Sequence, residues 1–230
     1  MVLRRRLVVA AIGLIALYGG YTLWFRNLSW FAIHDVTIEG ATTNERQIKA
    51  AVERAAQGMT TLHLNDGDLR SAVAQFPTVA AVGASTSFPH GLTVRIAERL
   101  PVAIARIAGR EVAVSADGYL LNGASFDAKD LPKIEGAGAH GARLNSDAGA
   151  QAAILGATPA PLKDRLTSSS WDESQGGVVI QLRGGPELRF GDGSRGAAKW
   201  AAVAAVLSSA QRGAPSYLDV SVPERPVAGG

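Results

Sequence analysis

The sequence predicts an α+β protein with one N-terminal transmembrane helix, a β-α-α-β-β module and a mixed, β-rich second domain. Three observations support this class. Residues 7–25 form one uncharged apolar run, residues 31–99 alternate between strand-like and helix-like periods, and residues 100–222 hold short apolar segments separated by turns. The ends, 1–6 and 223–230, are expected to be a short cytoplasmic tail and a flexible C-terminal tail.

The apolar run at 7–25 has the length and flanks of a membrane anchor. At about 1.5 Å of rise per residue it spans roughly 28 Å, close to the ~30 Å hydrocarbon core of a bilayer. Arginines at 4–6 favour a cytoplasmic N-terminus, and the rings of Trp24 and Phe25 favour the headgroup layer on the far side. A cleaved signal peptide would have a shorter apolar region that ends at small residues. We therefore expect a single-pass protein of the bacterial inner membrane whose body lies outside it.

The β-α-α-β-β module follows from its hydrophobic spacing. A strand over 33–39 precedes a helix that opens with capping-box spacing at 42–45. Apolar residues recur at i, i+3, i+4 and i+7 in this helix and in a second one that starts near 65–68. Two strands around a turn at 89–91 close the module, and in the last one apolar and polar residues alternate. The apolar positions are Ile48, Ala51, Val52 and Ala55 in the first helix, Leu69, Ala72, Val73 and Phe76 in the second, and Leu92, Val94 and Ile96 in the last strand.

The second domain is predicted as short elements joined by glycine- and proline-rich connections. Its clearest signal is Gly184-Gly185-Pro186 between two apolar segments, which is typical of a hairpin. The expected elements are a hairpin over 102–114, a loop over 122–146, a short helix over 147–157, a hairpin over 178–190, a helix over 194–210 and a strand over 216–222.

Charge and composition limit the possible partners. The formal net charge is +3, from 23 basic and 20 acidic residues, and the arginines at 4–6 account for this excess. The rest of the chain is neutral and poor in aromatic residues, so it lacks the basic stripe and stacking platforms of a nucleic-acid binder. The chain has no cysteine, which excludes disulfides and thiolate chemistry.

Catalytic and metal-binding motifs are weak or missing. Residues 136–141 fit G-x-G-x-x-G, but no buried strand is predicted before them and no helix directly after them. The histidines at 34, 63, 90 and 140 have no spacing that would place two on one helical face. We therefore expect no catalytic residue, no metal and no cofactor, and a binding protein without a small-molecule substrate.

The strand over 216–222 is the predicted binding element. It is rich in β-branched residues, and only the tail follows it, so it is expected at or near a sheet edge. An edge strand can pair with an extended segment of a partner. A central strand with both sides paired is the alternative. The candidate partner-binding residues are Tyr217, Leu218, Asp219, Val220, Ser221 and Val222.

These features together resemble the FtsQ/DivIB family of bacterial cell-division proteins. A single anchor is followed by FAIHDVTIEG at 31–40, QFPTV at 75–79 and FPHGLTVRIAERLPVA at 88–103, of which ERLPVA at 98–103 is the most specific part. SADGYLL at 115–121 and YLDVSVP at 217–223 support it at the right positions. The resemblance covers nearly the whole chain.

The resemblance implies a POTRA module over 31–99 and an FtsQ/DivIB-type β domain over 100–222. It also implies partners, namely FtsB- and FtsL-like proteins at the last strand and components of the septal peptidoglycan synthase, whose activity the complex helps to regulate at the division septum. The chain departs from the family pattern in its very short cytoplasmic segment and in Pro223 and Pro226 after the last strand. Two other functions stay open: an anchored envelope enzyme with the 122–146 loop as a cover, and a POTRA-type secretion or chaperone component.

Overall fold

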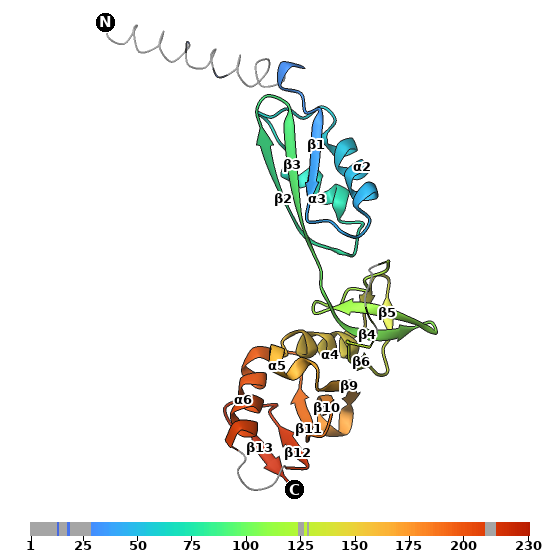
Figure 1. The fold of residues 1–230 in the computed structure, drawn as a ribbon, viewed down its shortest axis with the longest axis vertical. Helices are drawn as coiled ribbons and strands as arrows, with labels where there is room; N and C mark the ends of the chain where they lie inside the picture. The colour runs from blue at the N-terminus through green and yellow to red at the C-terminus, as the bar shows by residue number, and fades with distance from the viewer. Residues whose placement is uncertain (1–12, 14–17, 19–28, 124–126, 128, 210–214) are drawn as a thin grey trace, which may run out of the picture. The chain divides into compact units, whose positions relative to one another are not determined.

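The computed structural model describes residues 13, 18, 29–123, 127, 129–209 and 215–230, and it divides into two compact units, Met1–Glu98 and Arg99–Gly230 (Figure 1). Apart from Gly13 and Tyr18, the predicted anchor at 7–25 lies outside the described residues. Within the described part, no helix combines the length and apolar character that crossing a bilayer requires.

Unit 1 is a three-stranded sheet with two helices, in the predicted β-α-α-β-β order. Strand β3 is central, with β1 parallel to it on one side and β2 antiparallel on the other. Helix α2 contacts β1 and helix α3 contacts β2, and the two helices pack together (Figure 1). The elements are η2 (Ser29–Phe31), β1 (Asp35–Glu39), α2 (Glu45–Ala56), α3 (Asp66–Val73), β2 (Val79–Ser87) and β3 (Gly91–Glu98).

The core of unit 1 is built by the predicted apolar faces. On α2, Ile48 and Val52 stand one turn apart and are fully buried, as the helical spacing requires. They pack with Leu69 and Val73 of α3 against the alternating buried residues of β3, which include Val94. The prediction of one buried stripe per helix and one buried sheet face is therefore confirmed.

The start of α2 differs from the predicted capping box. The N-cap residue is Asn44, which has a left-handed backbone (φ 58°) and whose side chain makes no capping hydrogen bond. Thr42 and Thr43 instead donate their backbone N–H groups to the Glu98 carboxylate, both at 2.8 Å, and the Thr42 hydroxyl donates to it at 2.5 Å. Burial by itself would raise the pKa of Glu98, but these hydrogen bonds outweigh it and lower the pKa. The carboxylate thus ties the end of β3 to the loop before α2.

Unit 2 is one eight-stranded mixed sheet with helices packed against it. The strand order is β13-β12-β11-β10-β9-β6-β4-β5, and a separate two-stranded ribbon is formed by β7 and β8. Helix α4 contacts β4, β9 and β10, and α6 contacts α4 (Figure 1). The elements are β4 (Pro101–Ile107), β5 (Arg110–Ser115), β6 (Lys133–Ile134), β7 (Ala139–His140), β8 (Arg143–Leu144), α4 (Ser146–Gly156), α5 (Ala160–Lys163), β9 (Leu166–Asp172), η3 (Glu173–Gln175), β10 (Gly177–Leu182), β11 (Glu187–Gly191), α6 (Gly196–Ser209), β12 (Tyr217–Asp219) and β13 (Val227–Gly229).

The core of unit 2 centres on Trp200 of α6, which is only 1% exposed. Its ring lies 4.7 Å from that of Phe190 on β11, centroid to centroid, and its indole N–H donates to the Ile154 carbonyl of α4 at 2.8 Å. A buried indole needs such a partner for its donor. Trp200 therefore joins α6, α4 and the sheet.

Three segments of unit 2 differ from the sequence-based expectations. Strand β9 was not predicted, because its centre is polar; there, buried Ser169 donates to Gln151 of α4 at 2.8 Å, which satisfies its hydroxyl inside the sheet. The expected loop at 122–146 contains the short strands β6, β7 and β8. The expectation of a flexible tail over 223–230 is wrong, since Val227–Gly229 form β13 and pair with β12.

Candidate functional site

The predicted binding strand is an inner strand of the sheet. β12 runs parallel to β11 on one side and antiparallel to β13 on the other. Its neighbouring backbone groups are also used, because Glu187 N–H donates to the Ser216 carbonyl at 3.0 Å and Ser216 N–H donates to the Gly229 carbonyl at 2.7 Å. The edge position expected for 216–222 therefore belongs to β13, and of the two arrangements left open by the sequence the structure has the central one.

The six predicted side chains are divided between the core and the surface. Leu218 and Val220 are fully buried, so they support the sheet from within. Tyr217 is half-buried, and the Asp219 carboxylate accepts a hydrogen bond from Ser221 N–H at 2.9 Å. Val222, the last of the six, is a large hydrophobic side chain that is 52% exposed.

Strand β13 lies flush against the ring of Tyr217. A Cβ at Gly229 would overlap with the ring as it is placed here, so the absence of a side chain at Gly229 allows this close approach. The Arg189 guanidinium stacks on the Tyr217 ring, 4.1 Å from its centroid, and is held by Glu187 at 2.9 Å. Arg189, Tyr217 and Gly229 thus connect three adjacent strands, β11, β12 and β13.

The turn between β12 and β13 is fastened to the start of α6. Arg225 N–H donates to the Val222 carbonyl at 2.9 Å, which closes the turn. The Glu224 carboxylate pairs with both terminal nitrogens of Arg195, which lies just before α6. These hydrogen bonds lower the pKa of Glu224 and raise that of Arg195. Both side chains are exposed to solvent, which weakens the pair.

The outer side of β13 is the open end of this sheet. Among the described residues no strand pairs with that side, and Val227 is 55% exposed there. β13 could not be predicted from the sequence, because its three residues, Val-Ala-Gly, are too few to show a period of two. A turn signal was present, however, because Pro223 lies within the turn before β13 and Pro226 directly follows that turn.

The opposite edge of the sheet, β5, is protected. Its first residues, Arg110 and Glu111, are charged, and Glu111 pairs with Arg106 at 3.8 Å and Lys133 at 3.6 Å. Its second half is covered, because Leu121 N–H donates to the Ala113 carbonyl at 2.8 Å. Charges and a covering segment are the usual means by which an edge is kept from pairing with another chain. Within the part of the chain that the structure describes, the β13 edge has neither feature.

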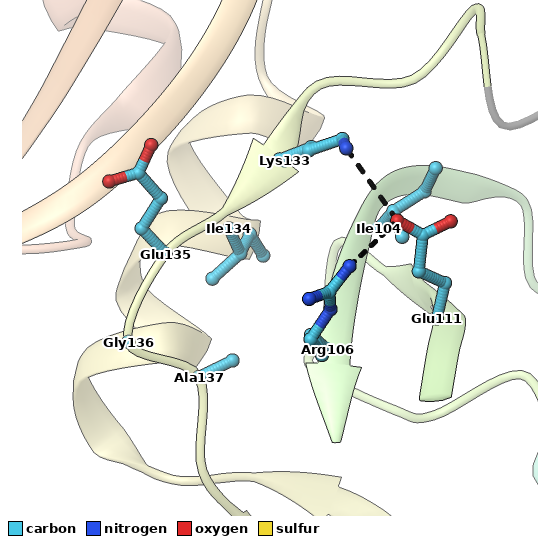
Figure 2. Close-up of a pocket in the computed structure, with 8 residues that line it drawn as sticks. All are labelled: Ile104, Arg106, Glu111, Lys133, Ile134, Glu135, Gly136 and Ala137. Carbon is cyan, nitrogen blue, oxygen red and sulfur yellow. Dashed lines mark ion pairs between the residues drawn. The ribbon is translucent and has the colours of Figure 1, made fainter. Parts of the chain in front are cut away.

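A cavity of about 460 Å³ lies between β4 and the segment after β6 (Figure 2). Four charged side chains line it: Arg106 and Lys133 each pair with Glu111, and Glu135 points away from them. The lining contains no hydroxyl, thiol or imidazole that could act as a nucleophile or relay a proton. The 122–146 segment, considered above as a cover for an enzyme site, thus borders a cavity of paired charges.

The sequence motifs considered for catalysis and metal binding lie in structural contexts that differ from those of the corresponding sites. The G-x-G-x-x-G match at 136–141 leads into the β7–β8 ribbon and not into a helix, so its context is not that of a dinucleotide site. His34 and His90 come together, with ring centroids 5.3 Å apart, although they are distant in sequence. Within the described part of the chain, no group of three or more His, Asp or Glu side chains is arranged to hold a metal.

Comparison with known proteins agrees with this architecture. Residues 31–99, which contain the whole β-α-α-β-β sheet, match the family model described as POTRA domain, FtsQ-type. The chain is thus a POTRA protein with a second, β-rich unit.

The relatives cover both units. The chain is 30% identical to the cell division protein FtsQ of Streptomyces collinus over 98% of its own length and 88% of the relative's. It is 28% identical to FtsQ of Streptomyces venezuelae, covering 97% and 81%, and 26% identical to FtsQ of Streptomyces coelicolor, covering 98% and 88%. The chain belongs to the FtsQ family of cell division proteins, and the resemblance seen in the sequence is confirmed.

Proposed function

We propose that this chain is a non-enzymatic assembly protein of the bacterial divisome. Residues 7–25 anchor it in the inner membrane with both units outside, and it binds FtsB- and FtsL-like partners at the division septum. Through these partners it helps to regulate septal peptidoglycan synthesis. Membership of the FtsQ family supports the role in division, and the open β13 edge supports the mode of binding.

The observation that favours strand addition is the difference between the two ends of the sheet. β5 is charged and covered, whereas β13 is uncharged and has no strand on its outer side among the described residues. An extended partner segment along β13 would form backbone hydrogen bonds that give affinity. The exposed side chain of Val227 on β13, and that of Val222 in the turn before it, would contact partner side chains and give selectivity.

The predicted residues 217–222 have a supporting role in this proposal. Tyr217 holds β13 in place through Gly229, and Leu218 and Val220 fix β12 in the core. A substitution such as Val220→Pro would therefore act mainly on folding, because the Val220 N–H donates to the Arg189 carbonyl at 2.8 Å. Exposed edge residues are the better places to test binding.

Membrane anchoring makes a small edge sufficient. Partners held in the same bilayer meet at high effective concentration, so a contact of a few residues can be occupied without high intrinsic affinity. This fits the short length of β13, Val227–Gly229.

The test is photocrosslinking in cells from Val227, with Arg110 on the opposite edge as the matched control. We expect crosslinks to an FtsB- or FtsL-like protein from Val227 and none from Arg110. In parallel, Val227→Lys should reduce co-purification of that partner, because a lysine on an edge disfavours pairing. Circular dichroism should show an unchanged fold. Crosslinks from Arg110 alone, or full partner recovery with Val227→Lys, would contradict the proposal.

A further inference from the structure

Within residues 29–98, the exposed large hydrophobic side chains lie at one end of unit 1. Trp30 is 81% exposed, Phe88 73% and Leu62 38%, and these are the exposed large hydrophobic residues within 29–98. Together with the adjoining Phe31 they are called the aromatic end. Single exposed hydrophobic residues are common on protein surfaces, but a cluster of them marks a place of interaction.

Three chain segments form the aromatic end, and hydrogen bonds hold them together. Thr61 joins them, because its N–H donates to the Phe31 carbonyl at 2.8 Å and its hydroxyl donates to the Pro89 carbonyl at 3.0 Å. The Thr86 hydroxyl donates back to the Thr61 carbonyl at 3.1 Å. The rings of Phe31 and Phe88 lie 5.6 Å apart, centroid to centroid. η2 and the β2–β3 turn accordingly share one end of unit 1 (Figure 1).

The aromatic end is also free of formal charge. Its segments, 29–34, 59–63 and 86–91, contain no Lys, Arg, Asp or Glu; their titratable side chains are His34, His63 and His90. Aromatic rings suit the boundary between headgroups and acyl chains, where Trp is enriched in membrane proteins. The rings themselves carry no charge that would have to be desolvated in that layer. Asp35 follows the first segment and lines a surface pocket with Phe88 and His90, so its carboxylate borders the aromatic end.

Chain length limits how far this end can be from a bilayer. Five residue steps separate Phe25, the last residue of the apolar run, from Trp30. A fully extended chain covers at most about 3.6 Å per residue, so Trp30 lies within about 18 Å of the end of the proposed anchor. This limit holds for any orientation of unit 1.

We propose that the aromatic end inserts into the outer headgroup layer of the membrane that holds the anchor, so that unit 1 contacts the bilayer at a second place. The ligand is a lipid surface, and Trp30 and Phe88 are the inserting side chains. The contact sets the orientation of unit 1 relative to the membrane. It rests on the proposed anchor at 7–25.

Site-directed spin labelling of the full chain tests this contact. The chain has no cysteine, so Ser87→Cys and Ala81→Cys each give one labelled site without further changes. Both positions are exposed on β2, with Ser87 beside the aromatic end and Ala81 about 20 Å away along the strand at ~3.3 Å per residue. The labelled chains are reconstituted in nanodiscs of phosphatidylethanolamine and phosphatidylglycerol. Collision rates with oxygen and with a nickel chelate then report whether each nitroxide lies in lipid or in water.

We expect the ratio of oxygen to nickel collisions to be several-fold higher at Ser87 than at Ala81. The double variant Trp30→Ser, Phe88→Ser should lower the ratio at Ser87 to the value at Ala81. Leu100→Ser is the matched control: it removes a side chain that is 76% exposed in unit 2 and should leave the ratio unchanged.

Two outcomes separate this inference from the proposed anchor. If the chain stays in the nanodisc and the Ser87 label is aqueous, the lipid contact is wrong and the anchor stands. If the chain is not retained in the nanodisc, the anchor and the contact both fail. A Ser87 label that leaves water only when partner proteins are added would show that the aromatic end binds protein, and would also overturn the inference.

Discussion

At the scale of single residues, Lys199 shows how a cation is accommodated in the core of unit 2. The residue is only 2% exposed, and its ammonium donates to Asp192 twice, to the carboxylate at 2.6 Å and to the backbone carbonyl at 2.9 Å. The hydrogen bond from Lys199, followed by that from Ser194, lowers the pKa of Asp192 to about 2. The Asp192 side chain itself is 71% exposed, so water screens part of this interaction.

Asp192→Asn should destabilise unit 2 at neutral pH, by about 1–3 kcal/mol, because the buried ammonium loses its charged acceptor. Solvent exposure of Asp192 places the effect toward the lower end of that range. The measurement is the free energy of unfolding in urea. Asp164→Asn is the control, since Asp164 is an exposed residue of the same type at the end of α5. Equal effects of the two substitutions would refute the role given to Asp192.

The same pair predicts a pH dependence. Because the pKa of Asp192 is lowered from 3.8 to about 2 on folding, its contribution is complete above about pH 4. The contribution is lost as the pH falls through about 2, where the native carboxylate takes up a proton. We therefore expect the difference in unfolding free energy between the native chain and Asp192→Asn to be constant from pH 7 to pH 5 and to shrink toward pH 2. Urea titrations across this range measure it, and a difference that grows on acidification would contradict the assignment.

At the scale of elements, the two helices of unit 1 begin in different ways. Helix α3 has a side-chain cap, because the Asn65 side chain accepts from Gly67 N–H at 3.0 Å and from Asp68 N–H at 3.4 Å. Helix α2 begins at Asn44, whose side chain makes no such bond. The start of α2 is located instead by the loop that Glu98 holds. Local capping thus determines one helix start, and a strand far along the sequence determines the other.

Asn65→Ala should lower the free energy of unfolding of unit 1 by about 1 kcal/mol, the usual cost of removing an N-cap side chain. Asn44→Gly is the matched substitution at the other helix. It should be close to neutral, because glycine readily adopts the left-handed backbone found there. Chemical denaturation of both variants checks the difference. A larger loss of unfolding free energy for the Asn44 variant than for the Asn65 variant would contradict this account of the two helix starts.

At the scale of the whole molecule, stability comes from two separate cores. The buried residues of unit 1 centre on Ile48 and Val52, and those of unit 2 centre on Phe190 and Trp200, with no residue in common. The core of unit 1 is built from the predicted faces of its helices and of β3, whereas the core of unit 2 also contains residues of unpredicted strands, such as Leu166 of β9. A chain without disulfides relies on this packing for stability.

Substitutions in one core should therefore act on one unit. Trp200→Ala should destabilise unit 2 by about 3–5 kcal/mol, through the cavity it leaves and the loss of the hydrogen bond to Ile154. Ile48→Ala should destabilise unit 1 by about 2–5 kcal/mol. Scanning calorimetry should show one transition moving in each variant while the other stays in place. Joint movement of both transitions would indicate that the units unfold as one.

Much of the fold could be predicted because periodic patterns report burial directly. The helical stripe at Ile48 and Val52 and the alternation through Val94 are local patterns with a buried face, and both were predicted correctly. Strand β9 could not be predicted in this way. Its central Ser169 is polar, and only the hydrogen bond to Gln151 of a distant helix makes its burial possible.

The candidate site likewise has features that the local sequence predicts and features that only the fold determines. The sequence by itself determined that Tyr217 to Val222 contain a strand and that the chain resembles the FtsQ family, because residue order and local composition are sufficient for both. Only the tertiary structure decided which strand lies at the sheet edge. That position depends on where β13 returns after its turn, and on Gly229 fitting against the Tyr217 ring, which are contacts between residues that no local pattern connects. For the same reason the aromatic end could be recognised only in the folded structure. The fold brings Trp30, Leu62 and Phe88 to one end of unit 1 from three separate segments.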